Sequence, residues 1–174
     1  MIFEITEEES HKAKIPHEIF LTNLVGNHIL WFIASLGVAG TYVQPLLLVP
    51  VISVATLIYI LWRARRSRQR DSWYVMCHWQ MCAKRSRLFI LMLTLLAVVS
   101  GLGWIAHTQL GMMKEAVYAL VGGLGILPVM VTVLVLILME SDGLHQAALH
   151  KLPESVVKRF PDGEMPAIIE ELKD

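Results

Sequence analysis

Four long runs of apolar residues dominate this sequence and limit what it can fold into. They cover 19–40, 43–62, 88–107 and 116–139. A helix rises about 1.5 Å per residue, so each run can cross a hydrocarbon core of roughly 30 Å. The mean hydropathy of +0.56 is well above that of an ordinary water-soluble domain. The runs therefore predict an all-α, polytopic membrane protein with four transmembrane helices, 19–139 forming the membrane domain.

The segment 63–87, between the second and third runs, predicts the orientation of the chain. It carries eight of the 15 Lys and Arg residues and one Asp. Positively charged loops stay on the cytoplasmic side, so this segment and both termini are expected inside the cell, in a bacterial inner membrane. The segment lacks Gly and Pro, which favours a helical hairpin with its turn at Arg70-Asp71-Ser72. The two cysteines in it are then expected to be free thiols.

Two acidic segments flank the membrane domain and are expected on the same side as the hairpin. Residues 1–18 carry five acidic and two basic residues, and 140–174 carry eight and four. The first residues lack the basic start of a signal peptide, so the first apolar run is expected to stay in the mature protein. Pro16 suits the first position of a helix that becomes the first span, and 166–173 suits a short final helix.

Small and amide side chains recur at helical spacing in three of the four runs. Such residues let helix backbones approach closely in a membrane, and amides hydrogen-bond across helices. One face of the first run collects Asn23, Asn27, Ala34 and Gly37, while the third and fourth runs hold one small-residue pair each. The predicted helix-packing residues are therefore Asn23, Asn27, Ala34, Gly37, Ala97, Gly101, Ala119 and Gly123.

Metal, haem and catalytic sites are poorly supported by the sequence. Cys77, His78 and Cys82 are close in a helix, but a structural zinc site needs four ligands and a second cysteine pair is missing. His28 and His107 fall at different depths, so they cannot share a haem. No catalytic motif occurs, and the runs contain no Asp or Glu of the kind that ion-coupled carriers use. We expect a protein without a cofactor that is not an enzyme.

The basic hairpin lies within a dozen residues of the bilayer on both sides, which favours lipid headgroups and acidic proteins over nucleic acid. Tryptophan side chains suit the same interface. The residues expected to make these contacts are Arg63, Arg65, Arg66, Arg68, Arg70, Trp73 and Trp79. The sequence thus favours a non-catalytic subunit or assembly partner in a membrane complex, which binds lipids and other inner-membrane proteins or itself. A small oligomeric channel or transporter is the alternative.

Overall fold

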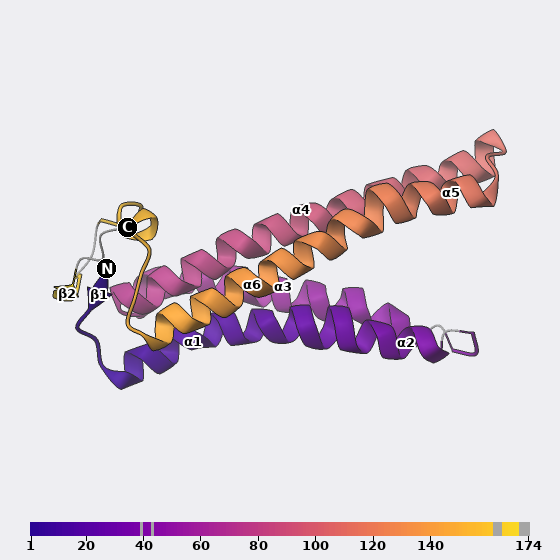
Figure 1. The fold of residues 1–174 in the computed structure, drawn as a ribbon. Coiled ribbons are helices and arrows are strands. Elements are labelled where there is room, and N and C mark those ends of the chain that lie inside the picture. Colours follow the sequence, from indigo (N-terminus) through magenta and orange to yellow (C-terminus); the bar gives the residue numbers. More distant parts are fainter. Residues whose placement is uncertain (39, 43, 162–164, 171–174) are drawn as a thin grey trace. The chain divides into compact units, whose positions relative to one another are not determined.

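The computed structural model describes residues 1–38, 40–42, 44–161 and 165–170, and Figure 1 shows the fold as a ribbon. In chain order the elements are β1 (Ile2–Phe3), α1 (Glu7–Leu21), the π-helix η1 (Thr22–Trp31), α2 (Phe32–Val38), α3 (Gln44–Arg70), α4 (Trp73–Leu110), α5 (Lys114–Leu120), the π-helix η2 (Val121–Ile126), α6 (Leu127–Ala148), α7 (Glu154–Val157) and β2 (Ile168–Glu170). Apart from the two short strands, the regular structure is all helical.

Four helical stretches are long and apolar enough to cross a membrane. They are Glu7–Val38, Gln44–Arg70, Trp73–Leu110 and Lys114–Ala148. Each coincides with one of the four apolar runs, which confirms the prediction of a helical protein with four candidate membrane spans. The turn between α3 and α4 lies at 71–72, as expected, so both helices continue well beyond their apolar runs.

The chain divides into two compact units. Unit 1 comprises Met1–Ser86 with Ile137–Asp174, and unit 2 comprises Arg87–Leu136. In unit 2, α4 returns through 111–113 into α5, η2 and the start of α6. The close approach within this hairpin occurs at Gly103 and Gly125. A Cβ on Gly103 would lie 3.0 Å from Val117 Cγ1, and one on Gly125 would lie 2.8 Å from Leu96 Cδ1. The hairpin therefore uses different glycines from those that the sequence suggested.

A capping box fixes the start of α1. The Thr6 hydroxyl accepts from the Glu9 N–H at 3.2 Å, and the Glu9 carboxylate accepts from the Thr6 N–H at 3.3 Å. Acidic residues at positions 7 to 9 also suit the positive end of the helix dipole. Pro16 consequently lies inside α1, and the prediction that it begins the first helix is wrong, because this box begins the helix at Glu7.

The polar ends of unit 1 pack into one small domain, here called the polar module (residues 1–18, 63–86, 140–161 and 165–170). β1 pairs antiparallel with β2, so the expected final helix is wrong at 168–170, and 171–173 lie outside the described residues. The Leu152 N–H also donates to Met1 O at 3.1 Å. The core of the module contains Phe3, Ala13, Ala64, Trp73, Tyr74, Val75, Cys77, Trp79, Met81, Ala83, Ala147 and Leu152. The terminal segments and the basic hairpin are therefore parts of one folded body.

Candidate functional site

The arginines of the hairpin fall into two groups. Arg63 forms a two-pronged ion pair with Asp71, at 2.7 and 2.9 Å, and its guanidinium lies 5.0 Å from the centre of the Trp79 ring. The other four, at the end of α3, are exposed. Among the described residues none forms an ion pair with Arg65, Arg66, Arg68 or Arg70. Arg68 does donate to Gln80 Oε1 at 3.1 Å, and the Arg66 guanidinium lies 5.4 Å from the centre of the Trp62 ring. The four charges are thus not balanced by acidic groups of the described residues, whereas Arg63 braces the hairpin.

Trp73 and Trp79 lie in the core of the polar module. Their side chains are only 6% and 2% exposed, and the Trp73 indole donates to Phe160 O at 2.8 Å. They differ in this respect from the interfacial tryptophans that the sequence suggested. Phe3 and the C-terminal segment cover Trp73, and contacts so distant along the chain leave no local pattern. Trp79 packs instead against Tyr59 and Arg63 of α3, the other arm of the hairpin. Within this chain their rings stabilise the hairpin and do not face lipid headgroups.

The predicted helix-packing residues fall into a buried pair and an exposed set. Asn23 and Asn27 are buried between η1 and α3, where Asn27 donates to Val49 O at 2.9 Å and Asn23 donates to Ser53 at 3.4 Å. The small residues face outward, so their use in packing stays a prediction about other helices. This outward set consists of Ala34, Gly37, Ala97, Gly101, Ala119 and Gly123.

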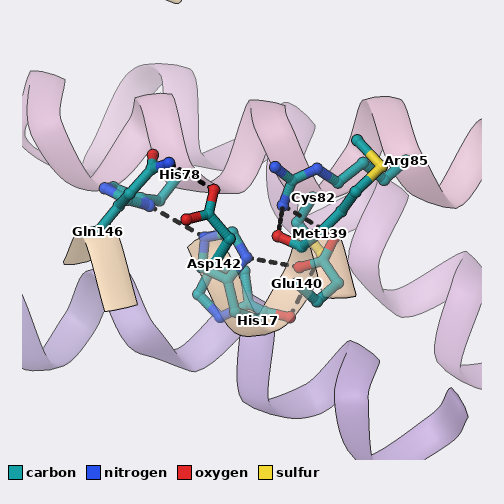
Figure 2. Close-up of polar contacts among 9 residues, drawn as sticks. His17, His78, Cys82, Arg85, Met139, Glu140, Asp142 and Gln146 are labelled. Atoms are coloured by element: carbon teal, nitrogen blue, oxygen red, sulfur yellow. Dashed lines mark hydrogen bonds and ion pairs between the residues drawn. The ribbon is translucent and has the colours of Figure 1, made fainter. Parts of the chain in front are cut away.

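The most concentrated polar site is one that the sequence did not single out. We call it the buried polar cluster (His17, His78, Arg85 and Glu140), shown in Figure 2. His17 Nδ1 lies 2.5 Å from Glu140 Oε2, and His17 Nε2 lies 3.0 Å from His78 Nδ1. Arg85 completes it, with Nη1 2.8 Å from Met139 O and 3.4 Å from Glu140 Oε1. The cluster joins α1, α4 and α6 within unit 1.

The contacts of His17 with Glu140 and His78 determine which ring nitrogens can carry a hydrogen. With both imidazoles neutral, His78 donates from Nδ1 to His17 Nε2, and His17 donates from Nδ1 to Glu140. In this arrangement the Glu140 carboxylate and the His17 Nε2 lone pair each accept one hydrogen bond. The Glu140 carboxylate is then balanced by Arg85. His78 Nε2 is left as a buried lone pair without a hydrogen-bond partner among the described residues.

Burial shifts the pKa of His78 within the cluster and that of Cys82 beside it. The side chains of His17, His78 and Glu140 are 0% exposed. Burial holds the pKa of His78 well below its usual value, and the positive charge of Arg85 acts in the same direction, as a proton on His17 would. Burial likewise raises the pKa of the Cys82 thiol well above its usual value, with Glu140 adding to the effect. Cys82 Sγ donates to Pro16 O at 3.3 Å, directly beside His17.

Gly143 lets the helices of the cluster approach each other. A Cβ at this position would lie 2.6 Å from His17 Cε1, 2.8 Å from His17 Nδ1 and 2.9 Å from Arg85 Nη1. Real Cβ atoms do not come so close to a neighbouring heavy atom. One turn further along α6, Ser10 Oγ donates to Ala147 O at 2.9 Å. The end of α6 is therefore fastened to α1 at two levels.

The closed geometry limits the chemistry of the cluster. A carboxylate that orients an imidazole is the arrangement of a general base, but a base must reach the proton of its substrate. Here all three partners are enclosed. Among the described residues, no three His, Cys, Asp or Glu side chains are arranged to hold a metal ion. The arrangement is suited to fastening helices through a charge-balanced, hydrogen-bonded contact.

No protein family model, curated protein or solved structure matches this chain. The cluster nevertheless had a signal in the sequence. His17 comes just before the first apolar run and Glu140 just after the fourth. In a four-span chain these two positions fall at the same level on the same side of the bilayer. His78 was weighed with Cys77 and Cys82 because they are neighbours in sequence, whereas its actual hydrogen-bond partner is His17.

Proposed function

We infer that this protein is a non-catalytic subunit or assembly partner of a bacterial inner-membrane complex, with the polar module and both termini in the cytoplasm. The observation that carries this proposal is the set of four exposed arginines at the end of α3, Arg65, Arg66, Arg68 and Arg70. They project from a helix that the core of the module holds in place. Exposed arginines without an acidic partner are suited to an acidic patch on another protein, and the helix that carries them is already folded before binding.

The membrane-facing part of the chain offers a second contact surface. In the most apolar 18-residue stretch of Trp73–Leu110 only 11% of the residues are buried. Ala97 and Gly101 lie exposed on this helix, and a Cβ on Gly101 would meet nothing within 4 Å. Exposed small residues at this spacing let a helix of another subunit approach closely. Together with the arginines, this outward set supports docking at two levels.

Reversing three of the exposed charges tests the proposal. A benzophenone placed at the exposed neighbour Gln69 reports the bound partner through photocross-links. We expect the variant Arg65→Glu, Arg66→Glu, Arg68→Glu to form at least tenfold fewer of them, because the attraction between the arginines and an acidic partner becomes repulsion. The matched control replaces the same arginines by Lys, which keeps the charge and should keep most of the cross-links. Cross-links that survive in the Glu variant would count against docking through these residues.

Charge reversal can also disturb insertion, since positive charges set the orientation of membrane helices. Thiol labelling, in intact cells, of a cysteine placed at position 70 distinguishes a change of membrane orientation from a loss of docking. We expect residue 70 to be protected from an impermeant reagent in the wild-type background. Labelling from outside the cell would contradict the cytoplasmic placement of the module, and with it this function.

A small oligomeric channel or carrier is the second candidate. It is favoured by a groove of about 480 Å³ along η1 and α3, lined in part by Thr22, Asn23, Asn27 and Thr56. Asn27 Oδ1 is buried there and accepts no hydrogen bond from the described residues. This function predicts a homo-oligomer and solute flux in liposomes that Asn27→Leu abolishes. A stoichiometric complex with another protein and no flux would favour docking instead.

A further inference from the structure

The buried polar cluster is the main polar contact between α1 and the end of α6. Glu140 reaches His17 on α1, and Met139 O and the Glu140 carboxylate both bind Arg85 on α4. Gly143 is packed against the His17 ring with no room for a side chain. If the His17–Glu140 contact is lost, the hydrogen bond from Ser10 to Ala147 O still joins α1 to α6.

The charge of the closed cluster is balanced only while both histidines are neutral. One positive group, Arg85, faces one negative group, Glu140. A proton added to His78 Nε2 would place a second positive charge in an enclosed site, with no hydrogen-bond acceptor for it among the described residues. Such a charge is much better solvated if the helices separate and water enters. The closed form therefore binds fewer protons than the open form, so acid favours opening.

We propose that the buried polar cluster is an acid-released latch, in which uptake of one proton by His78 separates residues 139–143 of α6 from α1 while the core of the polar module, which includes Ala147, stays packed. This inference does not depend on the proposed function. The titratable and charged groups near His78 are His17 from α1 and Tyr74, Cys77, Cys82 and Arg85 from α4. On α6, Glu140 is joined to His78 through His17, and the exposed Asp142 accepts from Gln146 at 2.6 Å.

The size of the effect follows from proton linkage. In the open form His78 is expected to titrate as an ordinary histidine, near pH 6.5, whereas in the closed form its own pKa lies well below that value. The equilibrium constant for opening is then expected to rise about tenfold between about pH 7.5 and about pH 5.5. The closed form has its full stability at pH values above the ordinary pKa of histidine, and it becomes less stable as the pH falls through that value.

The two native cysteines give a test that distinguishes the latch from general acid unfolding. Cys82 lies beside His17, at Pro16 O, whereas Cys77 belongs to the core of the module. The full-length variants Cys77→Ser and Cys82→Ser each leave one thiol. Labelling by 4,4′-dithiodipyridine, which reacts in mild acid, is followed in detergent at each pH. Each rate is divided by that of the same chain unfolded in urea and dodecyl sulfate, which removes the intrinsic pH dependence of the thiol.

The latch predicts that the normalised labelling of Cys82 rises about tenfold from pH 7.5 to pH 5.5 while that of Cys77 changes less than twofold. Adding His78→Gln, which cannot take up a proton, should make the Cys82 profile flat. A flat profile in the histidine-containing protein overturns the proposal. A parallel rise at both cysteines also overturns it, because the module would then be unfolding as a whole. The cysteine comparison decides the matter even if His78→Gln fails to fold.

Discussion

Replacing Glu140 by alanine is expected to lower the free energy of unfolding by about 3–5 kcal/mol, the usual cost of removing one partner from a buried charged contact. Glu140 is fully buried and accepts from both His17 and Arg85. Without its carboxylate, Arg85 keeps a single backbone acceptor at Met139 O and its charge is left largely unbalanced. The His17 Nδ1 hydrogen loses its acceptor as well. Both groups then stay desolvated without compensation.

Thermal unfolding in mild detergent, followed with a fluorogenic thiol reagent, measures this loss. Both native cysteines are buried and become reactive when the chain unfolds. For a chain of this length the predicted change corresponds to a fall of roughly 10 °C in Tm. Glu154→Ala is the matched control, because Glu154 forms a surface pair with Lys158, and such pairs contribute little. Equal Tm values for the two variants would show that the buried polar cluster does not stabilise the fold.

The membrane architecture could be predicted from the sequence because hydropathy is a local property. Every apolar run became a helix long enough to cross a bilayer, and the turn after Arg70 fell where a turn-forming Asp-Ser pair interrupts helix formers. The start of α1 is also local, and the Thr6 to Glu9 capping box was readable in the printed residues. Pro16 offered a competing start signal further along, but it lies inside a helix that the box has already begun.

The choice between neighbouring glycines could not be read from spacing. Gly101 and Gly103 lie two residues apart, so they point to nearly opposite sides of α4. Both can be matched to a small residue on the partner helix at a plausible distance. The structure packs Gly103 against Val117 and Val121 and leaves Gly101 open. Only the register of the two helices decides between the faces, and that register is set by the whole interface.

The polar module was beyond sequence reasoning for a different reason. Its core joins Phe3 to Trp73 and its sheet joins Ile2–Phe3 to Ile168–Glu170, partners that are far apart in the chain. A charged tail of modest hydropathy looks like a solvated segment. Residues 1–18 and 140–161 meet the hairpin at one end of unit 1, which makes burial of Trp73 possible. The candidate cluster arises from the same convergence.

Gly143→Ala is expected to lower the free energy of unfolding by about 1–3 kcal/mol, although alanine is normally the better helix former. The added methyl would overlap the His17 ring and the Arg85 guanidinium, and both are held by hydrogen bonds and cannot simply move aside. The same thermal unfolding measurement applies. Gly101→Ala is the control, since a Cβ there meets nothing within 4 Å, and it should leave stability unchanged or slightly raised.

Combining Gly143→Ala with Glu140→Ala shows whether the two changes act on one structure. In the single variant, the His17 ring resists displacement because Glu140 binds it at 2.5 Å. Once the carboxylate is gone, the ring is free to turn away from the new methyl group. The loss in the double variant should therefore be smaller than the summed losses by about 1 kcal/mol, which is typical of residues that share a partner. Strict additivity would mean that Gly143 and Glu140 stabilise α6 independently, and that His17 does not link them.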